Sequence, residues 1–315
     1  MKQKIAVIVP VYNAEKFLGR SLDSILNQTM KDVVIICVND NSTDSSLEIL
    51  NEYSKKSDNI IVLNNEENKG SGQTRNIALD YIFDNNIDVE YITMVDADDR
   101  IEPNTFEKAY NEASQSNADI LNYNFLPSTY WEYKTEATDD KKEYNGNCLD
   151  ALFEFQEFYT FVVCWSKLYK TELLKDIRFS DSKFFEDGGF AYKVLPRAQK
   201  LVVIPDTLYE YNIENPESTC GKITNENRFQ SILYTIKETI NDWNDLGILD
   251  KYMYKYIDHI LLYTSLVCPD YLTNENLESI NDSLGLNVLD EEVLNNLNDN
   301  TKELISNMSS KSKQH

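Results

Sequence analysis

The stretch "YITMVDADD" (residues 91–99) decides the fold and raises the first question about function. The apolar run "YITMV" is typical of a buried strand, and it ends in Asp96, Asp98 and Asp99. Three neighbouring carboxylates repel one another, so one of them should resist ionisation unless a cation lies among them. Acidic residues are abundant in this chain, and the aspartates could instead simply cap a turn. The stretch therefore predicts either an acidic turn or a divalent-cation site at the end of a strand.

Strands and helices alternate on both sides of this stretch, throughout the first 125 residues. Apolar runs typical of strands occupy residues 4–10, 32–38, 59–65, 90–96 and 118–125. Segments with helical periodicity or cap residues lie between them, at residues 14–28, 41–56, 71–84 and 104–116. Such alternation implies right-handed crossovers and a mostly parallel sheet. We therefore predict an α/β fold, with a mostly parallel sheet flanked by helices.

Polar and small residues follow four of the predicted strands. These residues are Pro10, Tyr12 and Asn13, then Asn39, Asp40 and Asn41, then Asn68, Gly70 and Gly72, and finally Asp96, Asp98 and Asp99. Ligands of open α/β sheets bind beyond the carboxyl ends of the strands. We expect all four clusters to lie at one edge of one sheet.

The rest of the chain is less regular. Residues 126–150 are polar and predict a surface excursion, with a short hairpin near "TYWEYK" (129–134), and residues 201–213 resemble a strand. Helical patterns dominate from about residue 224. The predicted organisation is a domain over 1–220, comprising a nucleotide-binding half (1–125) and an acceptor half (126–220), then a helical region (221–308) and a disordered tail (309–315).

The composition excludes several functions. The chain has 315 residues with 53 Asp and Glu against 30 Lys and Arg, a net charge of −23, which disfavours binding to nucleic acid or adsorption to an anionic membrane. The apolar runs are far shorter than the ~20 residues of a membrane-spanning helix, and no signal peptide is visible. Five scattered cysteines form no C-x-x-C pair, which favours reduced thiols and a cytoplasmic location. Only His259 and His315 are present, so carboxylates must carry any acid–base chemistry.

Several alternative motifs fail at particular positions. An EF-hand loop starting at Asp96 would need glycine where Ile101 stands. An aspartyl-phosphate phosphatase would need threonine or valine where Arg100 stands. The stretch "NKGSGQTR" (68–75) has Arg75 at the third glycine position of a dinucleotide loop, and it lacks the lysine of a phosphate loop. A D-x-D at a strand end remains, where Mg²⁺ or Mn²⁺ could bridge a diphosphate.

The assembled motifs resemble the inverting glycosyltransferase family 2 with the GT-A fold, in the subset that builds bacterial surface glycans. The resemblance runs from residue 4 to about 220. It rests on "IVPVYNAEKFLGRSLDSILNQT", "VNDNSTDSS", "NKGSGQTRNIAL", "MVDADD", "CWSKLYKTELL", "FFEDGGF" and "LYEYNIENPESTC". Asn39 and Asn41 stand where Asp and Gly are usual, Thr74 where Ala is common, and Asn212 where Arg is frequent.

The resemblance implies a donor pocket for a UDP-sugar. Pro10 and Tyr12 would line the nucleobase pocket, with Tyr12 stacking on the base. Asp40 would accept the imide N–H of uracil, which favours UDP. Arg75 would lie near the base or the diphosphate, and Gly70 belongs to the same donor site.

The resemblance also implies a metal site and a base. Asp96, Asp98 and Asp99 would form the metal site: Asp98 as ligand, Asp99 in support, and Asp96 holding ribose or metal-bound water. Asp187, in "FFEDGGF", would be the general base, with Gly188 and Gly189 allowing close substrate approach. Asp187 could instead only favour the N-terminus of a helix, as could Glu186.

The predicted activity is transfer of a hexose or N-acetylhexosamine from a UDP-sugar to a hydroxyl of a glycan, with Mn²⁺ or Mg²⁺. The acceptor would be a lipid-linked oligosaccharide, a lipooligosaccharide or a capsule precursor, which could draw the protein to the inner face of the membrane. Two alternatives stay open: another nucleotide-sugar enzyme on the same fold, and a non-catalytic glycan- or nucleotide-binding protein. The first would need a glycine loop after residue 10, and the second predicts loss of the carboxylates.

Overall fold

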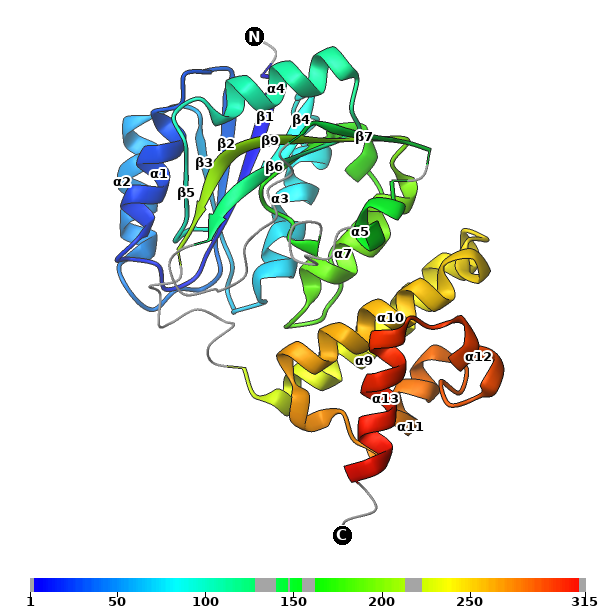
Figure 1. Cartoon of the computed structure of the whole chain (residues 1–315). Coiled ribbons are helices and arrows are strands. Elements are labelled where there is room, and N and C mark those ends of the chain that lie inside the picture. The colour runs from blue at the N-terminus through cyan, green and yellow to red at the C-terminus, as the bar shows by residue number, and fades with distance from the viewer. Residues whose placement is uncertain (1–2, 128–139, 147, 155–161, 213–222, 312–315) are drawn as a thin grey trace. The chain divides into compact units, whose positions relative to one another are not determined.

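The computed structural model describes residues 3–127, 140–146, 148–154, 162–212 and 223–311 (Figure 1). The chain divides into two compact units. The first comprises residues 1–181 and 190–218, and the second comprises residues 182–189 and 219–315.

Among the described residues, the first unit is built on one sheet of nine strands. The strands are β1 (Ile5–Val11), β2 (Val33–Asn39), β3 (Ile60–Asn64), β4 (Tyr91–Met94), β5 (Arg100–Ile101), β6 (Ile120–Pro127), β7 (Lys142–Asn145), β8 (Lys167–Lys170) and β9 (Lys200–Tyr211). Their order is β3-β2-β1-β4-β8-β6-β9-β5, and β7 pairs with β9. The predicted strand at 201–213 is thus present as β9.

The first four strands in this order form a parallel half-sheet. β1 pairs in parallel with β2 and β4, and β2 pairs in parallel with β3. Every residue of β2 is buried, and so is every residue of β1 except Pro10. Strands buried along their whole length are covered on both faces, which explains why these segments are continuous apolar runs.

The other half of the sheet is mixed. β8 lies between β4 and β6 and runs antiparallel to both, whereas β6 runs parallel to β9. β5 and β7 are antiparallel to β9. The predicted α/β fold is confirmed, and the antiparallel strands are an addition to the predicted pattern. β6 also crosses residue 125, so the two predicted halves share a single sheet.

The next helices along the chain belong to the first unit, except that residues 186–189 of the last one belong to the second unit (Figure 1). They are α1 (Leu18–Leu26), α2 (Ser46–Lys56), α3 (Ser71–Asp84), α4 (Thr105–Ser116), α5 (Asp150–Glu154) and α7 (Glu186–Val194), with short 3₁₀ turns η1 (Thr171–Leu174) and η2 (Leu195–Arg197). α3 packs on β1 and β2, and α4 packs on β6, β8 and β9. In Figure 1, α1 and α2 lie on one face of the sheet and α3 on the other, as expected when the strand order reverses after β3.

The second unit is helical. It contains α9 (Asn225–Asp245), α10 (Leu249–Val267), η3 (Pro269–Tyr271), α11 (Asn274–Leu284), α12 (Glu291–Asn296) and α13 (Asp299–Lys311). Trp243 is fully buried and packs against Tyr252 and Tyr256. His259 is also buried, which lowers its pKa well below the ordinary value and favours the neutral ring. His259 is therefore part of the packed interior of α10.

The predicted domain limits stay a prediction and can be set beside this division into units. The predicted boundary at residue 220 is beside the change of unit at 218/219, but residues 182–189 group with the helical unit, which was not predicted. α13 continues to Lys311, into the predicted tail. The predicted hairpin at 129–134 lies outside the described residues. Within the described parts of the chain, no helix is both long and apolar enough to span a membrane.

Candidate active site

The carboxyl ends of β1, β2 and β4 meet at one edge of the sheet. Val11 pairs with Asn39, and Ile8 pairs with Met94, so the strands end at neighbouring positions. The N–H of Asp40 donates to the carbonyl of Val11 (2.8 Å), which brings the loops after β1 and β2 together. The structure thus confirms that the polar clusters after these strands share one edge.

The loops after β1 and β2 are locked by reciprocal hydrogen bonds. The Asn13 N–H donates to the Ser42 hydroxyl (3.0 Å), and the Asn13 side chain accepts from the Thr43 N–H (2.8 Å). The Glu15 N–H donates to the Asp44 carboxylate (3.0 Å). Tyr12 precedes this network and is 52% exposed, so its ring is accessible to a ligand on a rigid support.

Asp40 is buried, and backbone and amide donors hold its carboxylate. One oxygen accepts from the Asn65 amide (2.7 Å) and from the Lys69 N–H (2.9 Å), and the other accepts from the Gly70 N–H (2.9 Å). Since a carboxylate has about four lone-pair sites, three protein donors leave capacity for one more. Asp40 is thus part of the site edge and also fixes the turn before α3.

Gly70 caps α3 in a conformation that other residues rarely adopt. Its φ is 85° and its ψ is 162°, a region essentially reserved for glycine. This conformation aims the Gly70 N–H at Asp40. Glycine is therefore required at this position for its backbone conformation.

Arg75 and Asp96, from α3 and the end of β4, form a short ion pair. The Arg75 guanidinium donates to the Asp96 carboxylate at 2.7 Å and is only 3% exposed, while the Asp96 side chain is 25% exposed. The guanidinium also lies over the ring of Phe179 (5.5 Å). The structure thus brings together two residues that were predicted separately.

Asp98 and Asp99 point to different environments. Asp98 is half-buried, and its backbone carbonyl accepts from the guanidinium of Arg20 on α1 (2.9 Å). Asp99 is buried, and its carboxylate accepts from the Asn212 N–H (2.7 Å) and from the hydroxyl of Tyr209. Burial raises the pKa of Asp99 well above its usual range, and the nearby charges of Asp96 and Asp98 raise it further.

The carboxylates suit a cation that is shared with a substrate. In the described residues, no three Asp, Glu, His or Cys side chains converge to form a metal site on their own. Both oxygens of Asp99 are turned to the end of β9, which leaves Asp96 and Asp98. Mg²⁺ usually keeps several waters and binds through one or two carboxylates plus substrate phosphates, and a pair of partly exposed aspartates fits that requirement.

Asp187 lies in the first turn of α7. It follows Phe185, whose φ of 59° is left-handed, and Phe190 of the same helix stacks on Phe179 with ring centroids 4.0 Å apart. Gly188 has a structural reason besides the predicted one: a Cβ there would overlap the ring of Phe185. The missing side chain at Gly188 accommodates that ring, and its expected role in substrate approach stays a prediction.

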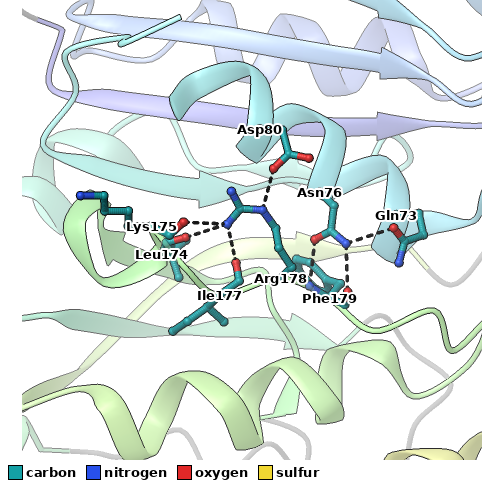
Figure 2. A network of polar contacts seen from close by, with 8 residues as sticks. All are labelled: Gln73, Asn76, Asp80, Leu174, Lys175, Ile177, Arg178 and Phe179. Atoms are coloured by element: carbon teal, nitrogen blue, oxygen red, sulfur yellow. Dashed lines mark hydrogen bonds and ion pairs between the residues drawn. The ribbon is translucent and has the colours of Figure 1, made fainter. Parts of the chain in front are cut away.

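A clasp between α3 and residues 174–180 was missed by the sequence analysis (Figure 2). The Asn76 side chain donates to the Phe179 carbonyl (2.9 Å) and accepts from the Phe179 N–H (2.8 Å). The Arg178 guanidinium donates to Asp80 (2.8 Å) and to the backbone carbonyls of Leu174, Lys175 and Ile177. The partners are about a hundred residues apart, and the only sequence signal is a polar Asn76 beside Arg75 on an otherwise packed helix. The clasp holds the segment that leads into α7.

A family model described as "Glycosyl transferase family 2" matches residues 6–178, more than half of the chain. The chain belongs to glycosyltransferase family 2. This confirms the resemblance inferred from the motifs, and it identifies the chain as a glycosyltransferase. The match covers the strands β1 to β8 and the strand-end residues described above.

Several curated proteins that are similar to this chain are named as glycosyltransferases. Glycosyltransferase GlyA of Streptococcus pneumoniae is 34% identical over 262 residues, covering 80% of this chain and 36% of GlyA. Glycosyltransferase GlyG of the same organism is 31% identical, covering 67% of this chain and 71% of GlyG. The poly(ribitol-phosphate) beta-glucosyltransferase of Bacillus spizizenii is 33% identical, covering 67% of this chain and 32% of the enzyme. The chain thus spans about a third of GlyA and of the glucosyltransferase.

Solved structures show that the fold is GT-A. Residues 1–349 of S. aureus TarS in complex with UDP-GlcNAc superpose with a TM-score of 0.75 at 22% identity, covering 98% of this chain and 88% of that one. The mannosyltransferase PcManGT from Pyrobaculum calidifontis, in complex with GDP-Man and Mn²⁺, gives a TM-score of 0.57 at 14% identity, covering 100% of this chain and 87% of that one. At these sequence identities, the similarity to the solved structures is evidence for the fold only.

Proposed function

We propose that this chain transfers a hexose or N-acetylhexosamine from a UDP-sugar to a hydroxyl of a glycan, with inversion at the anomeric carbon. The observation that carries the proposal is the convergence of Asp40, the Arg75–Asp96 pair and Asp98 at one sheet edge. The UDP-GlcNAc complex of TarS supports a UDP-sugar donor, and the name of the Bacillus glucosyltransferase supports transfer of a hexose.

The donor nucleotide would lie across the ends of β1 and β2. Tyr12 stacks on the uracil ring, with Pro10 beside it, and Asp40 accepts the imide N–H with its remaining lone pair. Gly70 and Arg75 belong to the same site through their contacts with Asp40 and Asp96. The protein donors on Asp40 hold the acceptor atom in place before the nucleotide arrives, which reduces the ordering needed on binding.

Asp98 would ligate a Mn²⁺ or Mg²⁺ ion, with Asp96 holding ribose or metal-bound water and Asp99 in a supporting role. When bound, such an ion neutralises the charge of the departing diphosphate. Asp96 is already paired with Arg75, and the guanidinium adds a second positive charge beside this part of the site. PcManGT is recorded with Mn²⁺, which supports a metal on this fold.

Asp187 would act as the general base. As the acceptor oxygen bonds to the anomeric carbon, the bond from that carbon to the diphosphate oxygen breaks, and the acceptor proton passes to the Asp187 carboxylate. One displacement of this kind inverts the anomeric centre. We propose as acceptor a lipid-linked oligosaccharide, a lipooligosaccharide or a capsule precursor, in the cytoplasm at the inner face of the membrane. Cys37, Cys148 and Cys268 are free thiols in the described part of the chain, which accords with reducing conditions.

Calorimetric titration of UDP into the protein, with Mn²⁺ and then with EDTA, tests the donor and the metal together. We expect UDP to bind more tightly with Mn²⁺, because Asp98 would hold the ion and the ion would offset the negative charge of the diphosphate. CDP is the matched control, since it carries the same ribose and diphosphate on a pyrimidine whose N3 has no hydrogen to donate to Asp40. Failure of UDP to bind under either condition would overturn the proposal, and equal binding of CDP would remove the role of Asp40.

Replacing Gly70 by alanine is expected to weaken UDP binding about tenfold or more. The substitution strains a glycine-only backbone conformation, at a cost of about 1–3 kcal/mol, and displaces an N–H that holds Asp40. Gly146→Ala is the control, because Gly146 also has a positive φ (76°), has open space around a Cβ, and lies outside the site. Thermal unfolding should show lower stability in both variants, and calorimetry should show lost UDP affinity only in Gly70→Ala. Equal UDP affinity in the two variants would contradict the role given to this turn.

A further inference from the structure

We infer that Tyr209 is a positioning residue for the carboxylate loop (residues 96–99), acting through Asp99 to hold Asp98 and Asp96 where they bind a divalent cation. The inference rests on the proposed metal site and adds a residue from β9, more than a hundred positions away in the sequence.

The hydroxyl of Tyr209 joins both ends of the carboxylate loop. It accepts a hydrogen bond from the Asp96 N–H (3.2 Å) and donates one to the Asp99 carboxylate. The other carboxylate oxygen of Asp99 accepts from the Asn212 N–H (2.7 Å). One end of β9 thus binds the first and the last residue of the loop at the same time.

The opposite side of the loop is held by α1. The Ser21 hydroxyl donates to the Asp96 carbonyl (3.2 Å), and the Arg20 guanidinium donates to the Asp98 carbonyl (2.9 Å). Within the loop, the Asp99 N–H donates to the Asp96 carbonyl (3.1 Å). The backbone is therefore fixed from two elements, while the side chains of Asp96 and Asp98 keep partial exposure to solvent.

The phenol itself is held rigidly. Tyr209 is 1% exposed, and its ring stacks on Trp165 with centroids 4.6 Å apart and planes at 14°. Trp165 also stacks on Tyr211 and meets Phe125 edge to face. This packing holds the ring, and with it the hydroxyl, in one position. The same packing would remain in a phenylalanine variant, which lacks only the hydroxyl.

Loss of the hydroxyl should loosen the metal ligands. Asp99 would keep the Asn212 N–H but lose its second donor, in a buried place where water does not readily replace it. Partners that orient metal-binding residues typically contribute 10–100-fold to metal affinity or activity. We therefore expect a loss of that size in metal-dependent binding.

The test compares Tyr209→Phe with Tyr123→Phe. Tyr123 is also fully buried in the same sheet, and its hydroxyl lies beside Thr93 rather than at the carboxylate loop. Calorimetric titration of Mn²⁺ in the presence of UDP should give about 10–100-fold weaker binding for Tyr209→Phe and unchanged binding for Tyr123→Phe. UDP affinity in EDTA should stay the same in both variants.

A double-mutant cycle with Asp99→Asn separates positioning from general destabilisation. If Tyr209 acts through Asp99, the double variant should bind Mn²⁺–UDP about as weakly as the weaker single variant. Additive losses of affinity, or a Tyr209→Phe variant that binds Mn²⁺ as tightly as Tyr123→Phe does, would overturn the inference. The proposed function would still stand in that case, provided that UDP binding by the wild-type protein depends on metal. A wild-type protein whose UDP binding ignores metal would overturn both.

Discussion

Replacing Asp98 by asparagine is expected to abolish the Mn²⁺ dependence of UDP binding and to lower kcat/KM for the UDP-sugar by on the order of 100-fold or more. Asparagine keeps the size of the side chain and one oxygen, but it removes the negative charge that a hard cation prefers. The carbonyl of residue 98 can still accept from Arg20, so the loop should keep its backbone. Calorimetry with and without EDTA, followed by transfer assays, measures both effects.

Asp84→Asn is the matched control for this variant. Asp84 is exposed and ends α3, so the substitution removes one negative charge from the same unit without touching the strand ends. It should bind UDP and Mn²⁺ as the wild type does. If Asp98→Asn kept full metal dependence, the metal would have to bind elsewhere, and the assignment of Asp98 as ligand would be wrong.

Replacing Asp187 by asparagine is expected to lower kcat by about 10²–10⁴-fold, the range in which a positioned general base contributes. Its UDP affinity should be unchanged, because the proposed contact is with the acceptor hydroxyl and not with the nucleotide. The measurement is initial transfer rate over a range of donor and acceptor concentrations, together with UDP titration.

Glu186→Gln is the control that distinguishes a role of Asp187 as general base from a role as a negative charge at the helix N-terminus. Glu186 and Asp187 both lie in the first turn of α7, where a negative charge contributes about 0.3–1 kcal/mol to a helix. If Asp187 only has that role, the two variants should lose similar, small amounts of stability and keep their kcat. A large loss of kcat in Asp187→Asn alone would support the base.

The sequence predicts the positions of those candidate site residues that come directly after a strand. The apolar run of β1 ends at Val11 and that of β2 at Asn39, so the pattern of residues alone places Tyr12 and Asp40 at the same edge. The parallel arrangement of these strands can be predicted from the alternation of strands and helices together with the right-handedness of the crossovers. The helices that bear Arg75 and Asp187 also follow from local patterns, which act over a few residues.

What the sequence could not indicate depends on distant partners. Asp99 was expected to support the metal site, but the sequence does not indicate its partners: Tyr209 and Asn212, at the end of β9, donate to its carboxylate. β8 is only four residues long, and its antiparallel place between β4 and β6 follows from pairing partners that are far away in the sequence. The space at Gly188 is likewise filled by Phe185, which a one-dimensional motif does not reveal.

The position of β8 has a consequence for how the chain acquires its structure during synthesis. β3, β2, β1 and β4 can pair as soon as Met94 has left the ribosome, but the second neighbour of β4 begins only at Lys167. Until then β4 is an exposed strand edge made of the buried residues Tyr91–Met94, which other nascent chains could pair with. The late insertion of one short strand closes this edge and joins the parallel half of the sheet to β6 and β9. The interval before β8 emerges is therefore when the chain is most prone to aggregate and has most to gain from a chaperone.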